Sequence, residues 1–247
     1  MKNTIAIMVP LLDMTSVFPR AYESVLKQTY KDWKLYLIDA KKSTENVKEM
    51  VDILNNKHGE RIIYSKQQGD GFLGVSLNEL WDQIKNNGHK YFCFLCGDDV
   101  WHSQKLEVQF NAFEHADREN CILTTCHRDI KYVSESFYDN VVFTKTGISA
   151  NSCNDLLSSF FFDKSVIDSK GEWTKGKLTS YHVQYLFDWE FAMESVKYGG
   201  TQIKKIGNIL AYNDLSHKGS LGYLGRHDSA IKGLMQEDVS VLKKLYS

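Results

Sequence analysis

Short apolar runs and longer amphipathic stretches alternate along the first half of the chain. The apolar runs predict five strands, at residues 4–9, 33–39, 61–65, 90–95 and 121–126. Apolar positions spaced three and four residues apart predict helices between them, at residues 17–25, 45–57, 72–86 and 103–113. Strand and helix therefore alternate four times, which is typical of an α/β protein whose mostly parallel central sheet carries helices on both faces.

The second half of the chain is less regular. Residues 158–167 read as a strand and a turn, residues 182–200 as a helix, and residues 201–206 and 209–213 as two short strands before a polar loop and a last helix. No internal repeat or linker divides the sequence, so we expect one domain over residues 1–247. The inward stripe predicted for the first of these helices consists of Tyr185, Leu186, Trp189, Ala192, Met193 and Val196.

The most apolar stretch of the sequence, residues 91–95, runs directly into Gly-Asp-Asp. Asp98 and Asp99 repel each other when both are ionised, so this place at the end of a buried strand is costly unless a cation binds there. Hard divalent cations such as Mg²⁺ take carboxylate oxygens together with substrate phosphates. A polar turn is the alternative interpretation, because Gly-Asp-Asp is also common turn chemistry.

Two further aspartates are predicted at the same edge of the sheet. Asp13 follows the first strand and Asp39 ends the second. Ligands of open parallel sheets bind outside the carboxyl ends of the strands, so the four acids mark this edge as the binding edge. The glycine-rich phosphate loops of dinucleotide and nucleoside triphosphate sites are absent from the first turn.

Composition limits the partners of the protein. The 247 residues carry a formal net charge of -1 without a long basic run, which gives no electrostatic case for nucleic acid. The apolar N-terminal run is too short to span a bilayer and is interrupted by Pro10, so we expect no transmembrane segment and leave peripheral membrane association open. Five cysteines, an odd number, predict free thiols in a reducing compartment, which we take as the cytoplasm.

A zinc site is the alternative reading of the cysteines. Cys93, Cys96, Cys121, Cys126 and His127 are ligand types that zinc accepts. Residues three apart on a strand point to opposite faces, so Cys93 and Cys96 would not converge on one ion. We therefore expect buried thiols here rather than zinc.

Several stretches resemble the family 2 glycosyltransferases. "IAIMVPLLD" followed by "SVLKQTYKDWKLYLID" resembles the opening strand, helix and second strand of that family, and "GDDVWHSQKLEVQ" is similar to its acidic metal motif. The resemblance implies a GT-A type, Rossmann-like fold and an inverting transfer of a sugar from a nucleotide diphosphate, a UDP-sugar by preference, to a hydroxyl of a glycan acceptor. It also implies a donor-binding half at 1–127 and an acceptor-binding half at 128–247.

The chain departs from the family pattern at three places. Leu11, Leu12 and Asp13 follow Pro10 where the family has a small or aromatic residue and Asn, Ala40 replaces a second acid after Asp39, and Cys96 stands where many members have a further aspartate. The first two departures fall where the family holds the nucleotide base, so the identity of the base stays open.

The resemblance implies roles for the acids. Asp99 would bind Mn²⁺ or Mg²⁺ at the diphosphate, and Asp98 would reach the ribose or the waters of the metal. Asp39 would hydrogen-bond the base in a pocket shaped by Pro10, and Asp13 belongs to the same nucleotide-binding set.

The second half supplies the remaining candidates. Asp188, near the start of the 182–200 helix, would act as general base on the acceptor hydroxyl, and Glu190 is the alternative base. His217, Lys218 and Arg226 could close over the diphosphate or the acceptor, and a solvated basic loop is the other reading. An inactive nucleotide- or glycan-binding module and a nucleotidyltransferase remain as alternative functions.

Overall fold

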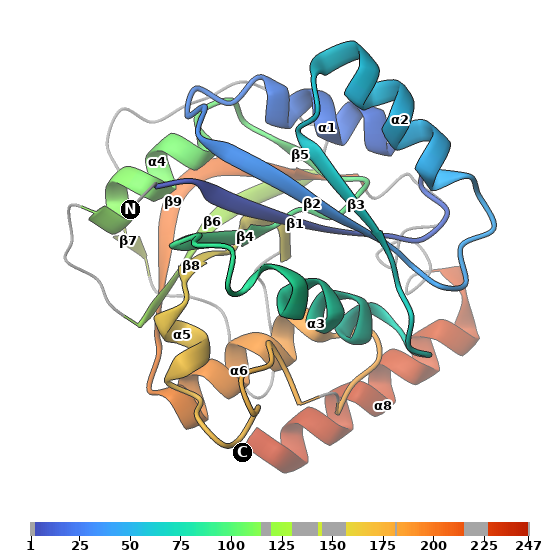
Figure 1. Cartoon of the computed structure of the whole chain (residues 1–247). Helices are drawn as coiled ribbons and strands as arrows, with labels where there is room; N and C mark the ends of the chain where they lie inside the picture. The colour runs from blue at the N-terminus through green and yellow to red at the C-terminus, as the bar shows by residue number, and fades with distance from the viewer. Residues whose placement is uncertain are drawn as a thin grey trace.

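The computed structural model describes residues 3–114, 120–129, 143–144, 157–180, 182–214 and 227–246 (Figure 1). Within these residues, nine strands form one sheet in the order β3-β2-β1-β4-β8-β6-β9-β5, with β7 pairing to β9 outside this path. The strands are β1 (Ile5–Leu11), β2 (Trp33–Asp39), β3 (Ile62–Lys66), β4 (Tyr91–Phe94), β5 (Val100–Trp101), β6 (Cys121–Asp129), β7 (Phe143–Thr144), β8 (Phe161–Asp163) and β9 (Gln202–Asn213).

The longest strand pairings are parallel. Strand β1 pairs in parallel with β2 and β4, β2 with β3, and β6 with β9. The short strand β8 is inserted antiparallel between β4 and β6, and β5 and β7 run antiparallel to β9. This mostly parallel sheet confirms the predicted α/β class.

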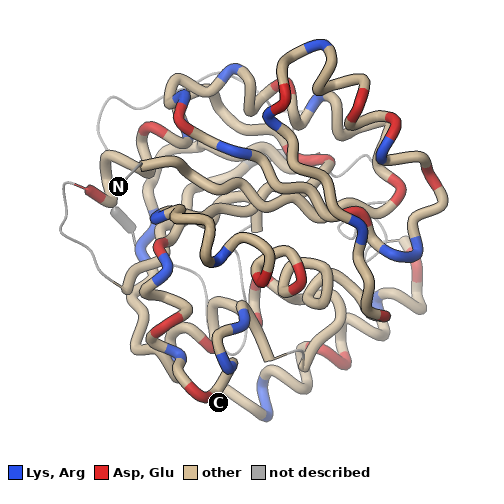
Figure 2. Tube along the Cα trace, in the orientation of Figure 1, with Lys and Arg blue, Asp and Glu red and all other residues tan. Residues whose placement is uncertain are grey.

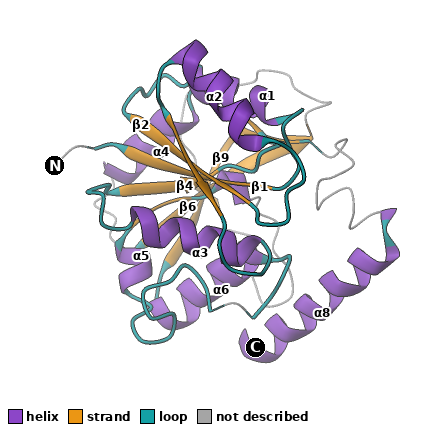
Figure 3. Ribbon diagram, turned by 45° about the vertical axis from the view of Figure 1, so that its right-hand side comes forward, coloured by secondary structure: helices purple, strands orange, loops and turns teal. Residues whose placement is uncertain are grey.

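Helices cover both faces of the sheet. Figures 1 and 3 show α1, α2 and α4 on one side, and α3, α5 and α6 on the other, with α8 beside α6. Their bounds are α1 (Phe18–Leu26), α2 (Val47–His58), α3 (Leu73–Ile84), α4 (Lys105–Glu114), α5 (Ser165–Asp168), α6 (Phe187–Gly199) and α8 (Ser229–Tyr246), with a short 3₁₀ turn, η2 (Leu157–Ser159).

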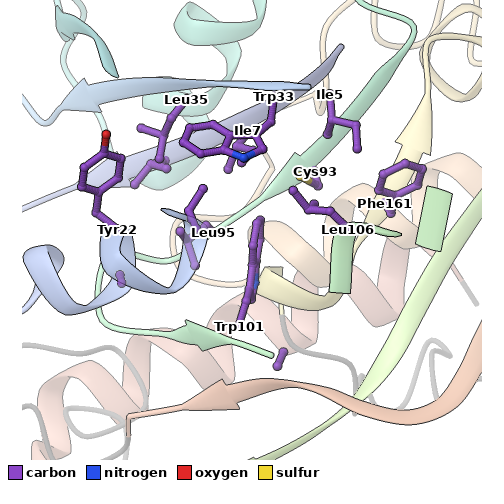
Figure 4. Close-up of a cluster of buried hydrophobic side chains, with 14 of the residues drawn as sticks. Ile5, Ile7, Tyr22, Trp33, Leu35, Cys93, Leu95, Trp101, Leu106 and Phe161 are labelled. Carbon is purple, nitrogen blue, oxygen red and sulfur yellow. The ribbon is translucent and has the colours of Figure 1, made fainter. Parts of the chain in front are cut away.

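Strand β1 explains why the first apolar run is continuous. Ile5 and Ile7 face the core on the α1 side, where Figure 4 shows them beside Trp33 and Leu35, while Ala6 belongs to the core on the α3 side. All three β1 side chains are fully buried. A strand covered on both faces has no polar face, and its sequence therefore reads as an unbroken apolar run.

The prediction for residues 182–200 was wrong in two details. Helix α6 begins only at Phe187, so the first two positions of the predicted stripe precede it. Val196 is 45% exposed, whereas Phe187 and Phe191 pack against Phe94 of the sheet. Trp189, Ala192 and Met193 of the predicted stripe are buried, and the packing of Phe187 and Phe191 against the sheet widens the buried face beyond that stripe. The two short strands predicted after this helix form one continuous strand, β9.

The distribution of charged residues agrees with the near-zero net charge of the sequence. Acidic and basic residues are interspersed along the trace in Figure 2, without a long run of one sign. None of the helices that the structure describes combines the length and apolar character needed to cross a membrane. The four described cysteines are free thiols, as predicted, and burial raises the pKa of Cys93 to about 12.

Candidate active site

The carboxyl ends of β1, β2 and β4 meet at one edge of the sheet, where two cavities adjoin. A cavity of about 250 Å³ is lined by Asp98, Asp99 and Asp188 among other residues. A second cavity of about 290 Å³ is mainly apolar and lies beside the end of β2. The two cavities share Pro10, Met14, Leu73 and Tyr185 as walls.

A tight turn delivers the paired aspartates to the first cavity. The Asp99 N–H donates to the Cys96 carbonyl at 3.1 Å, which closes the turn after β4. A side chain on Gly97 would place its Cβ 2.2 Å from Leu11 Cδ2 and 2.9 Å from Met14 Sδ. A larger residue at 97 would therefore require the Leu11 and Met14 side chains to move, because the chain leaving β1 lies directly against this turn.

Asp99 is held in an environment that disfavours its charge. The residue is 1% exposed, and burial, followed by the neighbouring Asp98 carboxylate, raises the pKa of Asp99 to about 8. The Ser158 hydroxyl donates to Asp99 Oδ2 at 2.5 Å and only partly opposes this shift. Within the described residues, Asp99 Oδ1 is buried without a hydrogen-bond partner. A divalent cation would supply both the missing partner and the opposite charge, so these residues fit the predicted metal.

Ser158 was missed by the sequence analysis, although "SSFFFDKSVI" contains it. Its hydroxyl also accepts from the Cys96 N–H at 2.8 Å, so it joins the turn to the Asp99 carboxylate. The Trp101 indole N–H donates to the Ser158 carbonyl at 2.8 Å, and the Gln109 amide donates to the Ser159 carbonyl at 2.8 Å. Trp101 and Gln109 of the acidic motif therefore position Ser158 rather than contact the cavity themselves.

Residues of α1 and of the end of β9 also hold the paired aspartates in place. The Arg20 guanidinium donates to the Asp98 carbonyl at 3.0 Å and forms an ion pair with the buried Asp214 carboxylate. The backbone N–H of Asp214 in turn donates to Asp99, which favours the ionised form of that carboxyl group. Two distant elements thus support the backbone of Asp98 and the carboxylate of Asp99.

Asp39 is buried at the end of β2 with one oxygen already engaged. The Lys66 ammonium lies 2.7 Å and the Tyr64 hydroxyl 3.1 Å from Asp39 Oδ2. Burial and the Asp39 carboxylate raise the pKa of Tyr64 to about 12, which keeps its hydroxyl a donor. Among the described residues, Asp39 Oδ1 has no hydrogen-bond partner. Asp39 therefore retains one acceptor oxygen, next to Ala40, which lines the apolar cavity.

The apolar cavity is bounded by the loop that leads into α3. Phe72 lies over this cavity, with the Lys42 ammonium 4.9 Å from its ring centroid and the Tyr185 ring 5.3 Å away. The buried Gln67 side chain holds the loop by donating to the carbonyls of Gly69 and Gly71 at 2.9 and 3.3 Å. Pro10 forms a wall of this cavity, and its predicted role in shaping the pocket of the nucleotide base stays a prediction.

Asp13 is engaged by the chain itself. Its Oδ1 accepts from the N–H groups of Thr44 and Glu45 at 2.7 and 3.0 Å and from the Ser43 hydroxyl at 3.1 Å. Partial burial alone would raise the pKa of Asp13, but these hydrogen bonds outweigh it and hold the pKa below its usual value. Asp13 fixes the loop after β2, and its predicted contact with the nucleotide stays a prediction.

Asp188 is the second residue of α6, closer to the helix start than predicted, and points its carboxylate to the first cavity. Its Oδ1 accepts from the Trp189 N–H at 2.9 Å. Positive partial charge at a helix N-terminus favours an ionised carboxylate there. Asp188 therefore faces Asp98 and Asp99 across one cavity, although it lies about 90 residues further along the chain.

Glu190 lies on the other flank of α6. Its Oε1 accepts from the His182 N–H at 2.7 Å, and the His182 ring Nδ1 is 3.0 Å away. His182, Glu190 and Glu194 place potential metal-ligand atoms within 4.8 Å of one another. However, Glu194 Oε1 already accepts from Trp173, Ser180 and Tyr246, and the buried Lys170 ammonium balances its charge. This cluster is an internal polar network, and the geometry favours Asp188 over Glu190 as the base.

His217, Lys218 and Arg226 lie outside the described residues. The chain enters that segment at Asp214, whose backbone contacts Asp99. Their predicted role stays a prediction.

Comparison with known proteins identifies the family. A sequence model of the family described as Glycosyl transferase family 2 matches residues 6–162, more than half of the 247 residues. The chain belongs to glycosyl transferase family 2.

An uncharacterized glycosyltransferase of Rickettsia prowazekii is 28% identical over 134 residues, 54% of this chain and 39% of that protein. One from Acanthamoeba polyphaga mimivirus is 29% identical over 151 residues, 56% of this chain and 58% of the relative. The family 2 chain thus spans roughly two fifths to three fifths of these relatives.

Solved structures share the fold. S. aureus TarS superposes with a TM-score of 0.65 at 14% identity, covering 85% of this chain and 60% of that one. The mannosyltransferase PcManGT from Pyrobaculum calidifontis, solved with GDP-Man and Mn²⁺, superposes with a TM-score of 0.64 at 10% identity. The match covers 98% of this chain and 69% of the mannosyltransferase chain. This likeness confirms the GT-A type of fold that the sequence resemblance implied.

Proposed function

We propose that this family 2 protein is a metal-dependent, inverting glycosyltransferase that moves a sugar from a UDP-sugar to a hydroxyl of a glycan acceptor. The observation that carries the proposal is the buried Asp99 oxygen without a partner, beside Asp98 and in the same cavity as Asp188. In support, TarS has been solved with UDP-GlcNAc, and PcManGT with GDP-Man and Mn²⁺.

The first cavity accounts for the charge that develops during transfer. Asp99, assisted by Asp98, would hold Mn²⁺ or Mg²⁺, which when bound neutralises charge on the diphosphate leaving group. Ser158 keeps the Asp99 carboxylate in place by engaging Oδ2, and Oδ1, which has no hydrogen-bond partner among the described residues, would be the oxygen that holds the ion. Asp188 would take the proton from the acceptor hydroxyl as that oxygen attacks the sugar. Attack on the face opposite the leaving group gives inversion.

The second cavity would bind the base of the nucleotide. The unpartnered Asp39 Oδ1 would accept the imide N–H of uracil, and Pro10 and Phe72 would pack on the ring. Lys66 and Tyr64 hold the carboxylate in the orientation for this contact.

Thermal denaturation tests the donor half of the proposal. UDP, GDP, dTDP and CDP are each added with and without Mn²⁺ to the wild type, Asp99→Asn and, as a control, Asp52→Asn on the exposed side of α2. Ligands that bind only the folded state raise the midpoint by mass action. We expect UDP with Mn²⁺ to raise the midpoint of the wild type and Asp52→Asn, with affinity falling at least about tenfold in Asp99→Asn. A metal-independent shift retained in Asp99→Asn would contradict the metal site.

Turnover separates an enzyme from a binding module. UDP release from UDP-sugars is measured for the wild type and Asp188→Asn. We expect Asp188→Asn to keep the Mn²⁺-dependent UDP shift and to lose about 10²-fold or more of the release rate. Nucleotide binding without release from any UDP-sugar would instead identify an inactive module.

A further inference from the structure

A third cavity lies between the start of α6 and the C-terminal helix α8. We call this cavity of about 340 Å³ the α6–α8 groove. Asp188, Leu186 and Met235 line both this groove and the 250 Å³ cavity that contains Asp98 and Asp99. The proposed base therefore stands at the junction between the metal cavity and the groove. The described residues that line it are Leu186, Asp188, Trp189, Lys232, Met235, Gln236 and Val239.

We propose that the α6–α8 groove binds the acceptor, and that this acceptor is a saccharide bearing an anionic group. The proposal rests on the proposed function. In a single displacement the attacking hydroxyl must approach from the side opposite the leaving diphosphate, and the base must touch that hydroxyl. Asp98 and Asp99 fix the diphosphate side of the metal cavity, so a hydroxyl reaching Asp188 from the groove enters on the other side.

The lining of the groove suits a sugar ring. Trp189, Met235 and Val239 supply an apolar floor for the C–H face of a pyranose. Gln236 and Lys232 lie four residues apart on α8 and therefore on one face of that helix. An amide beside a cation can bind ring hydroxyls and a carboxylate or phosphate substituent.

Charge selects the acceptor class. Lys232 is exposed, and none of the ion pairs found in the described part of the chain engages it. Apart from the base Asp188, none of the described residues that line the groove is acidic. An anionic substituent would therefore meet an unpaired ammonium, whereas a cationic acceptor would be repelled by it.

Polar and apolar contacts fix α8 beside the start of α6. The Asp238 carboxylate on α8 accepts from the backbone N–H groups of Gln184, Tyr185 and Leu186 at 2.7 to 3.3 Å. Leu242 and Tyr246 then pack with Trp189 in a separate apolar cluster. Helix α8 is thus fixed against the segment that carries Asp188, and the groove is a built feature of the fold.

Matched acceptors test the proposal. Methyl glucoside, methyl glucuronide and methyl glucoside 6-phosphate differ only in the charged substituent, and UDP release above the acceptor-free rate reports their use. We expect both anionic glycosides to be used with a lower KM than the neutral one. Lys232→Gln should raise the KM for the anionic glycosides about three- to fivefold and leave that of the neutral glycoside unchanged. Gln236→Ala should raise the KM for all three, about two- to tenfold, because it removes a neutral hydrogen bond.

Controls separate this inference from the proposed function. Lys244→Gln, at the far end of α8, should change no KM and should leave acceptor-free UDP release at the wild-type rate. Saturation-transfer NMR of the three glycosides gives a binding readout without turnover. Acceptor-free release that persists while the glycosides neither bind nor respond to Lys232→Gln and Gln236→Ala would overturn the groove assignment alone. Loss of acceptor-free release in the wild type would overturn the proposed function and this inference with it.

Discussion

Glu190 is a buried carboxyl group whose pKa burial, followed by the neighbouring Glu194, raises to about 8. The groups that face it are Glu194, Lys170, Thr179 and His182. The last two donate hydrogen bonds that only partly oppose the rise in the pKa of Glu190. The folded protein therefore keeps a proton on Glu190 at pH values where the unfolded chain, with a pKa near 4.5, has released it. A state that binds more protons loses stability as pH rises. Glu190 therefore makes the folded protein progressively less stable as pH rises from about 4.5 to about 8.

Glu190→Gln should remove this pH dependence, because the amide imitates the protonated carboxyl group. We expect wild-type stability to fall relative to the variant by up to about 1.4 kcal/mol per pH unit between about pH 5 and pH 7.5. Urea denaturation of both proteins at several pH values measures the difference between their free energies of unfolding. The contributions of the other titrating groups cancel in this difference. Burial lowers the pKa of Lys170 to about 8 from 10.5, so its own effect falls between those values and outside this window. Parallel stability curves for the two proteins would show that Glu190 is ionised in the fold.

At the scale of residues, the sequence predicted which acids reach the binding edge but not how each is used. Asp13 and Asp39 both follow strands of the same sheet, yet Asp13 binds a loop about 30 residues away while Asp39 keeps an acceptor oxygen. Ser158 reaches Asp99 across 59 residues of sequence, and the pattern around it signals only a strand. Partners of this kind depend on tertiary packing, which local periodicity does not encode.

At the scale of elements, Asp238 links α8 to the start of α6. Its carboxylate is 6% exposed and satisfies backbone donors of three consecutive residues in the segment before α6. Asp238→Ala should lower the free energy of unfolding by about 2 kcal/mol, because it leaves these donors without a charged acceptor. Asp238→Asn should cost less, since it keeps one acceptor oxygen.

Urea denaturation measures both effects, with Glu237→Gln on the exposed face of α8 as the control. We expect the control to stay within about 0.5 kcal/mol of the wild type. Equal stability of Asp238→Ala and the control would mean that α8 is held by its apolar face alone.

The elements of the first half were predictable, and those of the second half only in part. Four strand–helix units follow from periodicity, most clearly where β1, β2 and β4 are buried on both faces; β3 lies at the sheet edge, with Ile63 43% exposed. The place of β8 is different: its three residues, Phe161–Asp163, insert antiparallel between β4 and β6. Such a short strand carries no signal of its direction. The Phe187 and Phe191 face of α6 was likewise hidden, because Trp189 between them is also aromatic and the sequence does not show which of these rings meets the sheet.

At the scale of the whole molecule, the sheet joins the two predicted halves. Strand β8 of the second half separates β4 from β6, and β5 of the first half pairs with β9 of the second. The fully buried Asn78 on α3 adds a polar connection: its Oδ1 accepts from the Leu178 N–H at 2.6 Å, and its Nδ2 donates to the Thr179 carbonyl at 3.1 Å. Each half therefore completes hydrogen bonds of the other.

We accordingly expect one cooperative unfolding transition rather than two. Tryptophans report on both halves, with Trp33 and Trp81 in the first and Trp173 in the second, so fluorescence and far-UV circular dichroism should give the same midpoint. Asn78→Ala should shift both signals together by about 2 kcal/mol, because it leaves buried backbone groups unpaired. Asn86→Ala, at an exposed position after α3, is the matched control and should leave the midpoint unchanged. Separate midpoints, or an Asn78→Ala effect confined to one probe, would show that the halves fold independently despite their shared sheet.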